Sequence, residues 1–251
     1  MAGPAFGKLQ LTSLRQLLTV AASIFAGTVI ALPLTLEMQL AGRGTLVDVT
    51  APADAFTAPP RGAVLLAHGF TRSRATMAGH AEALGRAGFW VVVPDLPYLM
   101  DSRDNAVALR DLMAALREGA AGPPLDRFVL VGFSAGGLSA LLAADAPGVV
   151  GYIGLDPFDR PGGVGLAAAR KLQIPAFVLR GPSAACNAYG IADPWLDALP
   201  NLVESRQIEA ASHCDFEAPS DRLCRVICGA TDPSRQAIVR EFLVTRVQRL
   251  L

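Results

Sequence analysis

Residues 132–137 read Gly132-Phe133-Ser134-Ala135-Gly136-Gly137, and this stretch decides the expected fold. An apolar run, 128–131, precedes it and a helix-forming run, 138–146, follows it. The order predicts a strand, a sharp turn at Ser134 and a helix, the arrangement called a nucleophile elbow. Such a turn leaves space only for small residues two positions before and after the serine, where this chain has glycines. A Gly-rich loop is the alternative, because the chain contains 24 glycines.

A second strand is expected over residues 62–67, which are apolar and run into His68-Gly69-Phe70-Thr71. In a serine hydrolase with an elbow, the loop after this strand supplies one backbone N–H of the oxyanion hole, and the residue after the serine supplies the other. We therefore assign these two amides to Phe70 and Ala135. An ordinary strand-ending turn is the alternative interpretation of the His-Gly pair.

The chain has three histidines, which narrows the choice of a general base. His68 and His80 precede Ser134, whereas an elbow-type triad runs in the order serine, acid, histidine. His213 is therefore the predicted base. It follows a strand expected over 202–209 and lies in a polar loop, and the alternative is a surface histidine without a role. His80 is expected on a helix over 77–86, or at the rim of the site.

Three aspartates are candidates for the acid that orients His213. Asp156 ends a strand expected over 149–155, directly after the elbow helix, and is the favoured candidate. Asp193 is the main rival, in a long loop after a strand expected over 174–179, and Asp159 is the third candidate.

From about residue 62 to the C-terminus the chain resembles the α/β-hydrolase superfamily. The resemblance rests on residues 68–71, 132–137 and 154–157. These segments look most like chlorophyllases, platelet-activating-factor acetylhydrolases and polyester-hydrolase-like relatives. In the first two groups the acid follows the strand after the nucleophile, which favours Asp156. Ala135 departs from the arginine that chlorophyllases usually carry after the serine, and Ser134 from the cysteine nucleophile of dienelactone hydrolases.

Composition agrees with one enzyme-sized domain. The chain has 251 residues, of which 52% are hydrophobic and 18% charged, so it can bury a large core. With 22 basic and 22 acidic residues it has no basic field for nucleic acid. Strands, with the first expected over 44–50, alternate with helices, of which the last is expected over 231–251. The predicted class is α/β, with a doubly wound, mainly parallel sheet and an N-terminal apolar helix.

The N-terminal part is expected to direct the protein to or across a membrane. Residues 17–36 contain no charged side chain, a length that fits either a transmembrane helix or the apolar part of a secretory signal. We divide the chain into a signal or membrane-anchor segment, 1–40, and a hydrolase domain, 41–251. The expected location is membrane-anchored or exported, periplasmic or extracellular. A buried helix of the fold is the alternative.

All four cysteines fall in the last third of the chain, which fits an oxidising compartment. Four thiols allow three pairings, and a disulfide at Cys214 would tether the loop of His213. The other three cysteines are Cys186, Cys224 and Cys228. Only Cys224 and Cys228 are spaced as closely as zinc ligands usually are, so one such pair does not predict a zinc site. No metal and no cofactor are expected.

Together these residues predict a serine hydrolase that cleaves carboxylic esters of apolar or amphipathic small-molecule or lipid-like substrates. Phe70, Phe133 and Phe158 favour an apolar acyl or alcohol group. Thioesters, amides and lactones use the same chemistry, so the sequence does not choose among them. The alternatives are a chlorophyllase-like pigment ester hydrolase and a non-catalytic binding protein with the same fold.

Overall fold

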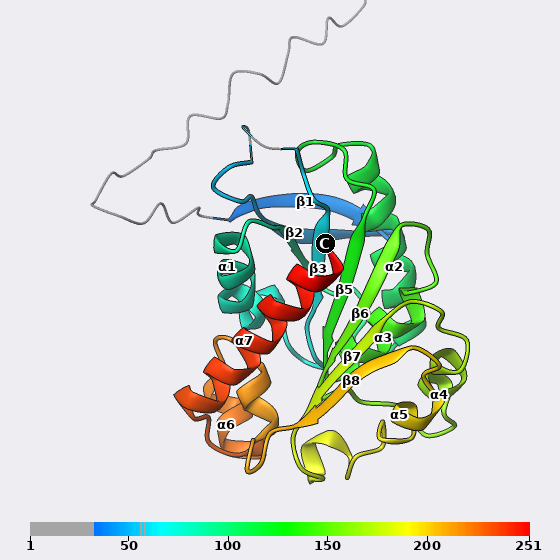
Figure 1. The fold of residues 1–251 in the computed structure, drawn as a ribbon, viewed down its shortest axis with the longest axis vertical. Helices are drawn as coiled ribbons and strands as arrows, with labels where there is room; N and C mark the ends of the chain where they lie inside the picture. Colours follow the sequence, from blue (N-terminus) through cyan, green and yellow to red (C-terminus); the bar gives the residue numbers. More distant parts are fainter. Residues whose placement is uncertain (1–32, 56, 58) are drawn as a thin grey trace, which may run out of the picture. The chain divides into compact units, whose positions relative to one another are not determined.

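The computed structural model describes residues 33–55, 57 and 59–251. Its centre is an eight-stranded sheet in the order β1-β2-β4-β3-β5-β6-β7-β8 (Figure 1). The strands are β1 (Leu34–Leu40), β2 (Arg43–Thr50), β3 (Ala63–Ala67), β4 (Trp90–Pro94), β5 (Phe128–Phe133), β6 (Val149–Leu155), β7 (Ala176–Arg180) and β8 (Leu202–Gln207).

The sheet is parallel from β4 to β8 and antiparallel at the β1 edge. β1 pairs with β2, and β2 with β4, in antiparallel register, whereas every other neighbouring pair is parallel. The carboxyl ends of β3, β5, β6 and β7 therefore meet at one edge, where loops after parallel strands commonly build a site. This confirms the predicted α/β class with a mainly parallel sheet.

Helices cover both faces of the sheet (Figure 1). The α-helices are α1 (Ala78–Arg86), α2 (Ser102–Arg117), α3 (Ala135–Ala143), α4 (Val164–Ala169), α5 (Pro194–Ala198), α6 (Arg222–Cys228) and α7 (Pro233–Leu250). Three short 3₁₀ helices, η2 (Arg74–Met77), η3 (Ala185–Asn187) and η4 (His213–Phe216), lie in the loops.

The core divides into two apolar clusters because successive side chains of a strand point to opposite faces. In β3, Ala63, Leu65 and Ala67 pack with residues of α2, α3 and α5, whereas Val64 and Leu66 pack with residues of α1 and α7. All five β3 side chains are buried, as expected for a central parallel strand. The two layers of helices thus hold the strand ends that carry the candidate site.

The prediction that residues 17–36 form one apolar segment is wrong for the residues of this stretch that belong to a strand. Leu34–Leu40 forms β1, so the last three residues of the apolar stretch 17–36 belong to a sheet strand that sequence analysis missed. The rest of that stretch, and with it the expected apolar helix, lies outside the described residues. Within the described part of the chain, no helix has the length and apolar character needed to cross a bilayer.

Candidate active site

Ser134 lies on a sharp turn between β5 and α3, as the sequence predicts. Its backbone has φ 53° and ψ −123°, a conformation that a side chain other than glycine rarely adopts. A Cβ at position 132 would lie 2.3 Å from the carbonyl oxygen of Gly136, and one at position 136 would lie 2.3 Å from that of Ala67. Both glycines are therefore required by the close approach of β3, β5 and α3.

Backbone hydrogen bonds join the turn to the loop after β6. The Ser134 N–H donates to the carbonyl of Leu155 at 3.0 Å, and the Ser134 carbonyl accepts from the Phe158 N–H at 3.1 Å. The Asp156 N–H in turn donates to the carbonyl of Leu179 in β7, at 2.7 Å. Ser134 and Asp156 are thus held by direct bonds between three neighbouring strand ends.

Asp156 and His213 are in direct contact. The Nδ1 atom of His213 lies 2.6 Å from Oδ2 of Asp156, a carboxylate that is almost fully buried. The other carboxylate oxygen accepts from the Gly181 N–H at 3.0 Å and from the Asn187 amide at 3.3 Å. Because its acceptor positions are used in this way, the carboxylate is fixed toward the imidazole.

The loop of His213 is itself braced. His213 begins η4, whose N-terminus is capped by Asp215: this carboxylate accepts from the Ser212 N–H at 2.8 Å and from Arg235 Nε at 2.7 Å. The imidazole packs on Phe133, with the ring centroids 4.6 Å apart. Ser134 and His213 line the same cavity, with no direct hydrogen bond between their side chains. In unliganded enzymes such a contact often forms only with substrate.

The two rival aspartates have other partners. Asp159 is buried, and its carboxylate accepts from the Arg160, Gly165 and Leu166 N–H groups and from the indole of Trp195 at 2.8 Å. This residue holds its own loop. Asp193 lies at the start of α5 and forms an ion pair with Arg180 at 3.8 Å.

The two remaining histidines are structural. His68 Nδ1 donates to the Gly69 carbonyl at 2.9 Å and its Nε2 accepts from the Leu96 N–H at 2.8 Å, so the ring is neutral and ties the loop after β3 to the loop after β4. Burial lowers the pKa of His68. His80 is buried in α1, where Nε2 donates to the Phe216 carbonyl at 3.0 Å, so it is not at the rim. Burial lowers the pKa of His80 to about 4.

A cavity of about 670 Å³ opens over Ser134. Phe70 and Ala135, the predicted donors to an oxyanion, both line it, and neither backbone N–H donates to another described residue. The wall is mainly apolar. Its large apolar members are Phe70, Leu96, Leu99, Met100, Phe133, Phe158 and Ile227.

An ionic cluster that sequence analysis missed connects the loop after β3 to the loop of His213. Arg72, in the cavity wall, pairs with Glu217 at 3.2 Å and with Asp221 at 2.5 Å. Glu217 is fully buried, and this burial raises the pKa of its carboxyl group, against the opposing effect of Arg72. These residues are far apart in the chain and no motif links them, so no sequence signal predicts the cluster.

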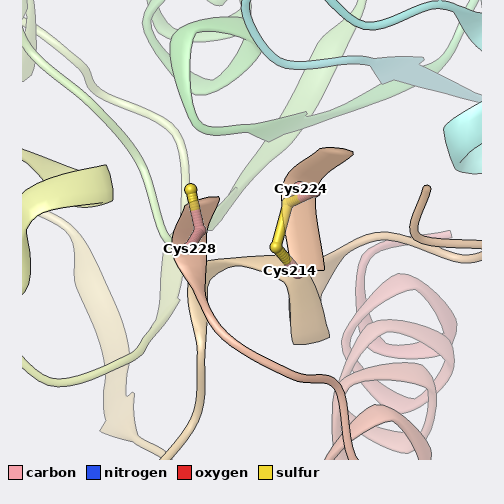
Figure 2. A group of neighbouring side chains, drawn as sticks. All are labelled: Cys214, Cys224 and Cys228. Carbon is pink, nitrogen blue, oxygen red and sulfur yellow. A yellow bond between two sulfur atoms is a disulfide. The ribbon is translucent and has the colours of Figure 1, made fainter. Parts of the chain in front are cut away.

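Two disulfides hold the loops around the cavity. Cys214 pairs with Cys224, and Cys186 with Cys228, one of the three pairings the sequence allowed. Figure 2 shows the Cys214–Cys224 bond with Cys228 beside it. The sulfur atoms of these three cysteines lie within 4.8 Å of one another, a spacing compatible with a metal ion. All of them are oxidised, however, and a disulfide lacks the thiolate that zinc requires.

Comparison with protein families agrees with the fold and the turn. Residues 64–248 match the sequence model described as the alpha/beta hydrolase family. The chain belongs to this family. No curated protein matches this alpha/beta hydrolase significantly.

Solved structures similar to this alpha/beta hydrolase include esterase 2 of Thermogutta terrifontis. Its apo form has a TM-score of 0.67 at 16% identity, over 91% of this chain and 99% of that one. The form phosphoramylated by tabun has a TM-score of 0.66 at 17% identity, over 89% of this chain and 98% of that one. The form phosphorylated by paraoxon has a TM-score of 0.66 at 17% identity, over 86% of this chain and 95% of that one. At these identities the likeness shows the shared fold.

Proposed function

We propose that this alpha/beta hydrolase is a serine esterase that cleaves carboxylic esters of apolar or amphipathic molecules. The observation that carries the proposal is the 2.6 Å contact between Asp156 and His213 in the cavity that contains Ser134. Ser134 and Asp156 directly follow β5 and β6, and His213 lies in the loop after β8. Their order along the chain matches the order serine, acid, histidine of an elbow-type triad. A non-catalytic binding protein has no need for this combination.

In the proposed mechanism, Ser134 Oγ attacks the ester carbonyl carbon while His213 Nε2 takes the hydroxyl proton. Asp156 holds the Nδ1–H of the ring and stabilises the imidazolium. The backbone N–H groups of Phe70 and Ala135 donate to the oxyanion of the tetrahedral intermediate. Collapse breaks the bond to the alcohol, which takes the proton from His213. Water then hydrolyses the acyl-enzyme by the same steps.

The lining of the cavity supports an apolar acyl or alcohol group. A screen should therefore use p-nitrophenyl esters of rising chain length, with a thioester, an amide, a lactone, a polyester and chlorophyll as further arms. We expect medium-chain esters to be turned over fastest, because apolar surface buried at the walls adds binding free energy. Preferred turnover of chlorophyll would instead favour the pigment hydrolase interpretation.

Replacement of the serine tests the mechanism directly. Ser134→Ala should abolish ester hydrolysis and labelling by a fluorophosphonate, while thermal unfolding stays close to wild type. Paraoxon is a second probe, because the structurally similar esterase of Thermogutta terrifontis is phosphorylated by it. Ser205→Ala is the matched control, since Ser205 is exposed on β8 outside the cavity. Full activity of pure Ser134→Ala protein would refute the proposal.

We also propose that the protein is exported or membrane-anchored. The apolar stretch 17–36 and the two disulfides support this location, because disulfides persist in oxidising compartments. Expression of the full chain, and of a chain that lacks residues 1–32, followed by fractionation, tests it. The full chain should be found in membranes or outside the cytoplasm, and the shortened chain in the cytosol. A full chain wholly in the cytosol would refute this location.

A further inference from the structure

The charges of the cavity have one sign. Among the described residues that line it, the side chains with a permanent charge are Arg72 and Arg160, and no carboxylate lines it. A cavity that served only neutral esters would not need a cation in a mainly apolar wall, because burying a charge is costly unless it is paired.

Arg72 is already neutralised. Its guanidinium pairs with the buried Glu217 at 3.2 Å and with Asp221 at 2.5 Å. Arg160 differs, because no carboxylate of the described residues lies within ion-pairing distance of its partly buried side chain. The exposed Asp101 is close enough to sense the Arg160 charge, although its carboxylate is engaged by the N–H groups of Arg103 and Asp104 at the start of α2.

The backbone of Arg160 is rigidly placed. The buried Asp159 carboxylate accepts from the Arg160 N–H at 2.7 Å and also from Gly165 N–H at 2.8 Å. Two residues before Arg160, the Phe158 N–H donates to the carbonyl of Ser134. Two residues span at most about 7 Å of extended chain, so Arg160 begins close to the proposed nucleophile. A cation whose backbone is anchored this near the nucleophile can contact a bound substrate and so select among substrates.

We propose that Arg160 is a specificity-determining residue that binds a carboxylate on the substrate, so that preferred esters carry an acidic group several bonds from the scissile carbonyl. This inference rests on the proposed esterase function. The planar guanidinium suits a carboxylate, which it can bind through two parallel N–H···O bonds. The apolar wall accommodates the chain between the ester and the acid.

The test compares substrates of equal chain length with and without the acid. One pair is monoethyl adipate and ethyl hexanoate, and a longer pair is monoethyl suberate and ethyl octanoate. A third pair, 6-butyryloxyhexanoate and hexyl butyrate, places the carboxylate on the alcohol side. Initial rates are measured by released alcohol, at low and at 1 M salt, for wild type, Arg160→Gln and Arg160→Lys. Arg206→Gln is the control for net charge, because Arg206 is exposed on β8.

Wild type should prefer the acidic member of at least one pair, and Arg160→Gln should lower kcat/KM for that acid about 10- to 100-fold, the range for a hydrogen bond to a charged group. Neutral esters should change less than about 2-fold, Arg160→Lys should retain part of the preference, and salt should weaken it. Equal rates for acidic and neutral esters in wild type, or a preference for the acid that Arg160→Gln keeps, would overturn the inference. If wild type hydrolyses no ester of either kind, the proposed function itself fails.

Discussion

The side-chain amide of Asn187 faces both oxygens of the Asp156 carboxylate, at 3.3 Å and 3.5 Å. Asn187 follows Cys186, which is bonded to Cys228 in the wall of the cavity. The orientation of the proposed acid is therefore connected to a covalent link between the loop after β7 and the end of α6.

The first prediction separates the two candidate acids Asp156 and Asp193. Asp156→Asn should lower kcat by several orders of magnitude, up to about 10⁴-fold, because the amide no longer fixes the required tautomer of His213. Asp193→Asn should cost little, because Asp193 pairs with Arg180 rather than with the imidazole. Steady-state kinetics on one ester measure both. A large loss in Asp193→Asn with little change in Asp156→Asn would place the acid one strand later.

A second prediction concerns Asn187 as a positioning residue. Asn187→Ala removes a donor to Asp156 but leaves the Gly181 N–H in place, so kcat should fall about 10-fold with little change in KM. Asn187→Asp should cost more, since it sets a second negative charge beside the carboxylate. Asn201→Ala, which alters an exposed asparagine, is the control. A variant whose unfolding temperature falls while kcat is unchanged would limit Asn187 to a structural role.

The strands that carry the site could be predicted because each has a strong local signal. β5 and β6 are short apolar runs beside glycines, and the requirement for Gly132 and Gly136 follows from the turn alone. β1 was missed although Leu34–Leu40 alternates apolar and polar residues, since its first residues were counted with the apolar stretch before it. Residues 34–36 carry both signals, and the longer uncharged stretch 17–36 is the stronger of the two.

The supporting residues of the site could not be predicted, because they are distant in the chain and share no motif. Glu217 and Arg72 are 145 positions apart and become neighbours only when η4 packs beside the loop after β3. No sequence pattern marks Arg160, and its neighbour Asp159, a candidate acid by sequence, instead fixes the Arg160 backbone in the fold. Sequence order suggests the reacting groups, while three-dimensional packing determines what holds them.

The third prediction is a pH dependence of stability that originates in His80. Its pKa is about 4 in the folded protein and about 6.5 unfolded, because burial opposes the charged ring. Between these values the unfolded chain binds a proton that the folded protein does not, so stability falls as pH falls from 6.5 toward 4. The slope is at most about 1.4 kcal/mol per pH unit for one proton.

Urea unfolding of wild type and His80→Gln at pH 7, 6 and 5 measures this slope. The glutamine can still donate to the Phe216 carbonyl but does not titrate, so its stability should change less over this range. His68, whose pKa is also lowered, and Glu217, whose raised pKa acts in the opposite direction, are present in both proteins and cancel in the comparison. Equal slopes for the two proteins would contradict the prediction.

The last prediction assigns different effects to the two disulfides. The cysteines of Cys186–Cys228 are 42 positions apart and those of Cys214–Cys224 are 10 apart. Because the longer loop restricts the unfolded chain more, the first disulfide should stabilise the fold by about 4 kcal/mol and the second by about 3 kcal/mol. Cys186→Ala/Cys228→Ala should therefore lower the unfolding temperature more. Cys214→Ala/Cys224→Ala should instead cost more kcat, because Cys214 directly follows His213 and the bond holds the loop that aims the imidazole. Thermal unfolding and kinetics on the two double variants, each compared with wild type with and without reductant, check both orders. If the variant that loses more stability also loses more kcat, the separate role of the Cys214 bond is wrong.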